Sequence, residues 1–118
     1  MALNRQQILD AQDLKTVDVD VPEWGGPVRI REFSGKDRDA FLTAAHKRRD
    51  KGVIELTALL VALAIVDDDG EEMFTEADIQ TLNTKSAHAL VRLEEEIRKL
   101  NRMNEEEAEK NSDPGQTG

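Results

Sequence analysis

Two alternating segments, Val17-Asp-Val-Asp-Val21 and Val28-Arg-Ile-Arg31, flank the sequence Pro22-Glu-Trp-Gly-Gly-Pro27 and decide the fold. Strict alternation of apolar and charged residues is typical of a strand that buries one face. The prolines and glycines between the two segments favour a tight connection. The sequence therefore predicts an antiparallel β-hairpin near the N-terminus.

The predicted register of the hairpin places side chains of matching chemistry opposite one another. Cross-strand neighbours of opposite charge, or both apolar, are how a hairpin specifies its register. The expected pairs are Val21 with Val28, Val19 with Ile30, Asp20 with Arg29, and Asp18 with Arg31. Because a two-stranded hairpin is only marginally stable by itself in water, its valine face is expected to pack on helices.

The segment after the hairpin carries a helix-start pattern. Ser34 is the expected N-cap, and Asp37 completes a capping box. This helix is predicted to extend to about Asp50 and to end before Gly52. Its expected buried residues are Phe41, Leu42 and Ala45.

Residues 53–66 are apolar on most sides and are predicted to form the central buried helix, which ends at the turn 67–70. Thr75 and Asp78 form a second capping pattern, and Phe74 and Ile79 occupy the positions of a hydrophobic staple. This short helix is expected to end near Leu82.

The last predicted helix begins around Lys85 and carries an apolar stripe with alternating spacings of three and four residues. The stripe consists of Leu90, Leu93, Ile97 and Leu100. Glu94 with Arg98 and Glu95 with Lys99 are expected to add i,i+4 ion pairs.

The predicted fold class is mainly α with a small β-hairpin (α+β). The N-terminal antiparallel hairpin would pack on a bundle of about four helices, after a weakly amphipathic helical segment at residues 3–14. Residues 1–104 are expected to form a single domain. Residues 105–118, which are acidic and polar, are expected to form a disordered tail.

The composition excludes several classes of partner. The 118 residues include 25 acidic and 16 basic side chains, for a formal charge of −9, so the basic surface that nucleic acids require is missing. The longest apolar run, residues 58–66, is far shorter than the ~20 residues of a membrane-spanning helix. With no cysteine in the chain, disulfides and thiolate metal sites are excluded. Neither a nucleic-acid partner nor a membrane is expected.

The acidic turn resembles part of a calcium-binding loop but lacks a required ligand. With Gly70 at the sixth position of an EF-hand loop, Glu76 falls at the twelfth, where a bidentate carboxylate is needed. However, Ile65 falls at the first position, where it cannot bind calcium, and Glu72 falls at the usually apolar eighth. The predicted structure is an exposed turn between helices, without bound metal.

No arrangement of residues indicates catalysis. His46 and His88 stand on separate predicted helices and are expected at the helix surface. The sequence Gly25-Gly26 lacks the lysine of a phosphate-binding loop. The carboxylates gather in turns and on a charged helix face, where solvent screens them, rather than in an apolar pocket. We therefore expect no enzyme activity, no cofactor and no metal site.

Two features remain as candidate partner-binding residues. Trp24 lies in the hairpin loop and is predicted either to fold back over the core or to anchor a partner, because tryptophan is enriched at binding hot spots. The stripe Leu90, Leu93, Ile97 and Leu100 is predicted either to pack in the core or to offer a groove to a partner helix. If neighbouring subunits shared this stripe, it would serve both as packed core and as a binding surface.

The order of these features resembles the tail assembly chaperones of long-tailed bacteriophages with non-contractile, siphovirus-type tails. The resemblance runs from about Ile8 to Leu100. The segments that carry it are Val21-Pro-Glu-Trp-Gly-Gly26, Val28-Arg-Ile-Arg31, Ser34-Gly-Lys-Asp-Arg-Asp-Ala-Phe41, Val66-Asp-Asp-Asp-Gly70, Met73-Phe-Thr-Glu-Ala-Asp78 and Ser86-Ala-His-Ala-Leu90.

The resemblance implies a scaffold rather than a catalyst. Such proteins bind and solubilise the tape measure protein and recruit tail tube subunits around it. They act in the host cell cytoplasm and are not expected in the mature virion. Many phages also make a longer, frameshifted form of the protein, and residues 111–118 would suit the short form. The implied partners are the tape measure protein, the tail tube protein and further copies or the longer form of the chain itself.

Two other functions remain open at the level of sequence. One is a structural tail or head–tail joining protein that stays in the virion, although such proteins usually contain more strands than one hairpin. The other is a regulatory adaptor of host proteins. Mass spectrometry of purified particles distinguishes the first of these from an assembly chaperone.

Overall fold

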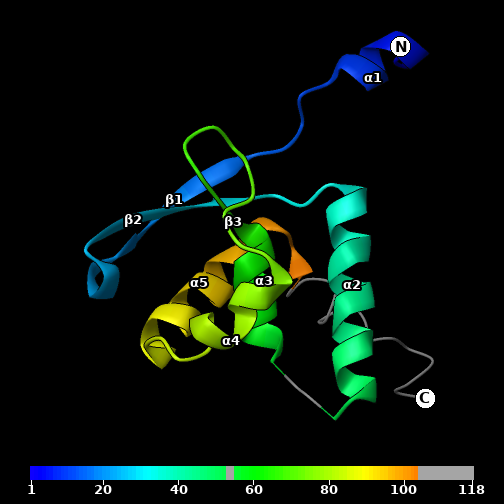
Figure 1. Ribbon diagram of the computed structural model, residues 1–118. Coiled ribbons are helices and arrows are strands. Elements are labelled where there is room, and N and C mark those ends of the chain that lie inside the picture. Colours follow the sequence, from blue (N-terminus) through cyan, green and yellow to red (C-terminus); the bar gives the residue numbers. More distant parts are fainter. Residues whose placement is uncertain (53–54, 104–118) are drawn as a thin grey trace, which may run out of the picture.

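The computed structural model describes residues 1–52 and 55–103, and Figure 1 shows an antiparallel sheet beside a group of helices. The fold is α+β, as predicted. In chain order the elements are α1 (Arg5–Asp10), β1 (Thr16–Val21), the 3-10 helix η1 (Pro22–Trp24), β2 (Gly26–Arg31), α2 (Gly35–Asp50), α3 (Leu56–Ala64), β3 (Ile65–Val66), the 3-10 helix η2 (Glu76–Asp78), α4 (Ile79–Leu82) and α5 (Ala87–Leu100). The predicted tail, residues 105–118, lies outside the described residues.

The sheet has the strand order β1-β2-β3, and its third strand was not predicted. Of the helix expected over residues 53–66, positions 53 and 54 lie outside the described residues, and α3 covers Leu56–Ala64. Ile65 and Val66 instead pair with Ile30 and Arg29 of β2. A short apolar run does not by itself distinguish a buried helix from a buried strand. Here the β-branched residues at its end continue the sheet, a conformation that suits their restricted side chains.

The predicted register of the hairpin is wrong by two residues. Val19 lies opposite Val28, and Asp18 lies opposite Arg29. Gly26 pairs with Val21, because η1 closes the connection with four residues instead of the six expected. A shift of two residues keeps every side chain on its predicted face. The valine face is therefore buried as expected, but the charge partners change.

The core is aliphatic and is centred on α3, which contacts α5, α2 and α4. Nearly all of α3 is buried, from Ala58 to Ala62 and at Ala64. Phe41 and Ala45 of α2 are buried as predicted, but Leu42 is 47% exposed. One residue advances a helix by about 100°, so Leu42 points away from the face that its neighbour Phe41 buries.

The predicted helix starts are confirmed. Ser34 Oγ accepts a hydrogen bond from the Asp37 backbone N–H at 3.1 Å, and the Asp37 carboxylate accepts from the Ser34 N–H at 3.0 Å. The Thr75 N–H donates to the Asp78 carboxylate at 2.9 Å. Ser86 caps α5, in which Arg98 and Glu94 form the predicted i,i+4 pair.

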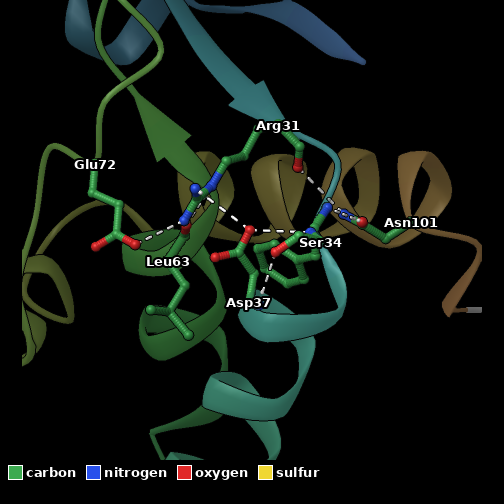
Figure 2. Close-up of polar contacts among 7 residues, drawn as sticks. Arg31, Ser34, Asp37, Leu63, Glu72 and Asn101 are labelled. Carbon is green, nitrogen blue, oxygen red and sulfur yellow. Dashed lines mark hydrogen bonds and ion pairs between the residues drawn. The ribbon is translucent and has the colours of Figure 1, made fainter. Parts of the chain in front are cut away.

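Arg31 joins four parts of the fold (Figure 2). Its guanidinium donates to the Leu63 carbonyl at 2.9 and 3.2 Å, close to the C-terminal end of α3. It also donates to Glu72 at 3.0 Å and lies 3.5 Å from the Asp37 carboxylate of the α2 cap. The true register frees Arg31 for this role, because Asp18 pairs with Arg29 at 2.8 Å instead.

The N-terminal segment stands apart from the rest. Figure 1 shows α1 beyond the Thr16 end of the hairpin, joined to β1 by an extended linker. α1 buries none of its residues. Among the described residues, the protein has no helix whose length and hydrophobicity would let it cross a membrane.

Candidate protein-binding groove at the hairpin tip

Trp24 lies at the tip of the hairpin, where η1 turns the chain from β1 into β2. Gly25 follows with a φ of 84°, a left-handed conformation that favours glycine. The Trp24 side chain is partly buried and packs against the hydrophobic core. The ring therefore packs on the core, as one of the two interpretations predicted, and it also lines an open hollow.

Two adjacent hollows of about 360 and 450 Å3 share Trp24 and Phe74 as walls, and we call them together the hairpin-tip groove. The first hollow lies between the hairpin and the segment 65–74, and its lining includes Val28 and Met73. The second lies against α4, where Leu82 contributes to its wall. The groove thus presents aromatic and aliphatic surface from three separate elements.

An ion pair holds the hairpin tip against α5. Arg92 Nη1 and Nη2 donate to the two carboxylate oxygens of Glu23 at 2.6 and 2.9 Å. This bidentate hydrogen bonding lowers the pKa of Glu23 to about 2 from its ordinary value of 4.5, with a smaller contribution from a backbone hydrogen bond. Because Glu23 directly precedes Trp24, the pair helps to position the aromatic wall of the groove.

Carboxylates of the segment 67–78 line the groove: Asp67 and Asp68 line the first hollow, and Asp78 lines the second. The segment contains no Lys or Arg, and its other acidic residues, Asp69, Glu71, Glu72 and Glu76, line neither hollow. On the hairpin side, Arg29 is paired with Asp18, and this hydrogen bond lowers the pKa of the Asp18 carboxyl. Lys85 is the basic residue that lines the second hollow. The groove is therefore apolar within and mainly negative at its edge.

Met73 and Phe74 belong to the groove, although the sequence pattern assigned neither of them to a binding surface and placed Phe74 in a helix staple. Met73 is 51% exposed, whereas Phe74 is partly buried against the core. A methionine and a phenylalanine inside an otherwise acidic segment are a signal that could have identified them. An exposed, flexible methionine is also typical of surfaces that bind varied apolar partners.

The structure places the predicted stripe of α5 in the core and not on an open surface. Leu93 and Ile97 are fully buried, Leu90 is 5% exposed, and Leu100 is partly buried against the core. Of the two interpretations of the stripe, core packing therefore describes these side chains. Trp24 is the one predicted binding residue that reaches the groove.

The acidic turn uses its carboxylates to shape the backbone. Asp67 Oδ1 accepts hydrogen bonds from the N–H groups of Asp69 and Glu71 at 2.8 and 3.0 Å. Ile65, at the first position of the supposed calcium loop, is buried in β3. The turn leads from β3 into a β-bridge between Val66 and Glu72, instead of joining two helices as predicted. Within the described ranges, no three His, Asp or Glu side chains gather in a metal-binding arrangement.

The histidines lie on separate helices, as predicted. His46 of α2 is exposed and lies 3.3 Å from Asp50, one helical turn along. His88 is exposed on α5. Neither residue lines the hairpin-tip groove, so the chemistry of the groove is that of apolar packing and charge.

Comparison with known proteins identifies a similar fold. No protein-family model matches the sequence, and no curated protein matches it. Among solved structures, the chain is similar to the bacteriophage HK97 tail assembly chaperone, with a TM-score of 0.56 and 22% sequence identity. The alignment covers 80% of this chain and 90% of that protein. At this level of identity, the likeness shows a shared fold.

Proposed function

We propose that this protein is a phage tail assembly chaperone that binds and solubilises the tape measure protein through the hairpin-tip groove. The observation that carries the proposal is an apolar groove with an acidic edge on a fold similar to that of a tail assembly chaperone. The ordered sequence features that resemble the family support the same function. In this role the protein also recruits tail tube subunits.

The chemistry of the groove suits an apolar helical client. A helix that docks in a groove inserts side chains spaced three and four residues apart, and Trp24, Phe74 and Met73 offer complementary apolar surface. Tape measure proteins are long and largely helical, so their apolar stripes would aggregate in water without cover. A chaperone with a net charge of −9 keeps such a complex soluble.

Co-expression tests the proposed function. The tape measure protein from the same phage is expected to accumulate in the soluble fraction with this chain and to precipitate without it. Met73→Asp is expected to reduce the rescue, because it places a charge inside the apolar groove. Leu42→Asp is the matched control, since Leu42 is similarly exposed but lies outside the groove. If neither rescue nor co-purification occurs, the chaperone function is wrong.

The place of action follows from the same proposal. An assembly chaperone works in the host cell cytoplasm and leaves the particle before the tail is complete. Mass spectrometry of purified virions is expected to detect the tail tube protein but not this chain. Stoichiometric amounts of the chain in the particle would instead support a structural tail or head–tail joining protein.

A further inference from the structure

The two hollows of the hairpin-tip groove carry different charges. Asp67 and Asp68 line only the first hollow, whereas Lys85 lines only the second. Trp24 and Phe74 line both hollows and therefore lie between these charges. In Figure 1 the loop that follows β3 rises to the level of the hairpin, while α4 lies lower, among the helices. The groove is thus negative at one end and carries a lysine at the other.

The negative charge of the first hollow is not cancelled by Arg29. This guanidinium donates to Asp18 at 2.8 Å and lies 4.0 Å from the Asp68 carboxylate. The lining of the hollow contains three carboxylates and one guanidinium, which leaves a formal charge of −2. The Asp68 side chain is fully exposed. It can therefore approach a cation on a bound partner.

The second hollow offers a positive charge to a partner. The Asp78 carboxylate accepts hydrogen bonds from the Thr75 N–H at 2.9 Å and from the Thr75 hydroxyl at 3.4 Å, so it serves to cap η2. Lys85 is exposed, and its ammonium group forms no ion pair with another residue in the described ranges 1–52 and 55–103. In this hollow Lys85 is therefore the charge that stays open to a partner.

A helix that fills both hollows meets a different charge at each end of the groove. Its apolar residues, spaced three and four apart, would contact Trp24 and Phe74. A lysine or arginine on one side of this apolar stretch would lie near Asp68, and a glutamate or aspartate on the other side would lie near Lys85. Opposite charges across an interface favour the matched partner, and like charges disfavour a wrong one.

A uniformly basic partner is a less favourable alternative. The net charge of −9 attracts any cationic segment at long range. At physiological ionic strength, however, exposed charges more than about 8 Å apart are largely screened, so that contacts inside the groove decide. A cation placed at Lys85 meets a like charge there, and an anion placed at Asp68 does the same. The groove therefore fits a helix whose two ends differ in charge.

We propose that the hairpin-tip groove selects client helices of split charge, with basic residues over the first hollow and acidic residues over the second. Asp68 and Lys85 determine this specificity, and they set which end of the client lies over which hollow. The selection rests on the proposed function of the groove, because it concerns the choice of client for the same surface.

Three synthetic peptides of about 18 residues, long enough to form a helix, test the selection. They share one leucine pattern and lack tryptophan. The split-charge peptide carries glutamates at one end and lysines at the other, and the two controls carry lysines at both ends or glutamates at both ends. Because Trp24 is the only tryptophan of the chain, its emission reports the binding of each peptide. At about 0.15 M salt the split-charge peptide is expected to bind roughly threefold to tenfold more tightly than either control.

Charge reversals in the protein assign the two ends of the groove. Lys85→Glu is expected to shift the preference towards the all-lysine peptide, and Asp68→Lys towards the all-glutamate peptide. Lys36→Glu is the matched control, since Lys36 is an exposed lysine that lines neither hollow, and it should leave the order unchanged. All three side chains are exposed, so the variants retain their core. Differences in helicity between the peptides cancel, because the same three peptides are compared across the variants.

Three results would contradict the selection, and they separate it from the proposed function. If the all-lysine peptide binds the wild type most tightly and Lys85→Glu does not change the order, net charge selects the partner. If the three peptides bind equally and Met73→Asp removes the binding, the groove is a client site without charge selection. If no peptide changes the Trp24 emission while the tape measure protein is still rescued, the chaperone function stands but uses another surface.

Discussion

Helices α1 and α3 form a sharp contrast between local and tertiary stabilisation. α1 has a complete capping box and a Gln6–Asp10 side-chain hydrogen bond of 2.9 Å, but it buries nothing. α3 has no side-chain cap at its N-terminus, and yet it forms the centre of the core. Its ends are held by other elements, through Arg31 at the Leu63 carbonyl and Arg48 at Glu55. Capping marks where a helix begins, whereas burial decides how much it contributes to stability.

Matched leucine truncations should give the largest difference between the two helices. Leu59→Ala in α3 removes a fully buried side chain and is expected to lower the free energy of unfolding by about 2–5 kcal/mol. Leu9→Ala in α1 is expected to change it by less than about 0.5 kcal/mol, because Leu9 is exposed. Urea denaturation in dilute solution, followed by circular dichroism, measures both. Equal losses would mean that α1 packs on the body.

Removal of the tertiary contact at the end of α3 should have an intermediate effect. Arg31→Met removes the hydrogen-bond donor of the Leu63 carbonyl and the ion-pair partner of the Asp37 carboxylate, which keeps its hydrogen bond from the Ser34 N–H. The Arg31 side chain is only 17% exposed. The expected loss of unfolding free energy is about 1–3 kcal/mol.

Arg29→Met is the control for the loss of an arginine. Arg29 is more exposed and its Asp18 partner lies at the surface, so the expected loss of unfolding free energy is smaller than that of Arg31→Met. Chemical denaturation of both variants compares them. A larger loss for Arg29 than for Arg31 would contradict the assigned role of Arg31.

Acid should produce the smallest effect, at the hairpin tip. The folded-state pKa of Glu23 is about 2, below its ordinary value of 4.5. The Glu23–Arg92 contribution is therefore fully present above pH 4.5 and is lost as the pH falls from there towards 2. Glu23→Gln should be less stable than the wild type at pH 6, with the difference shrinking in this window. Denaturation of both proteins at several pH values measures the difference in their unfolding free energies. A difference that does not change with pH would exclude the Glu23–Arg92 ion pair as its source.

Much of the fold could be predicted because its signals are local. The alternation around Val19 and Ile30 indicated the hairpin, and the Ser34–Asp37 capping box marked the start of α2. The third strand was missed because Ile65 and Val66 continue an apolar run that is equally compatible with a helix. The register was missed because η1 uses fewer residues than the turn composition suggested. Both errors concern contacts between segments, which a local pattern does not specify.

The candidate site was only partly predictable. Trp24 was identified by its residue type and its place in a loop, and it does line the groove. Met73 and Phe74 come from a segment nearly 50 residues further along the chain, and only the packing of that segment beside the hairpin makes them neighbours of Trp24. The stripe on α5 has the periodicity of a binding surface, but the fold buries it under α3 and the sheet. Periodicity identifies an apolar face without indicating what covers it.

The sequence by itself determined the elements that depend on near neighbours: capped helices, an alternating hairpin, an acidic exterior and an aliphatic core. The tertiary structure alone decided which apolar faces are covered. It buried Leu93 and Ile97, left Leu9 and Leu42 exposed, and brought Trp24 beside Phe74. The physical reason is that apolar burial is non-directional, so a sequence pattern sets how much surface must be covered while chain topology sets where. The groove that is left open in this way is the surface that would bind an apolar client.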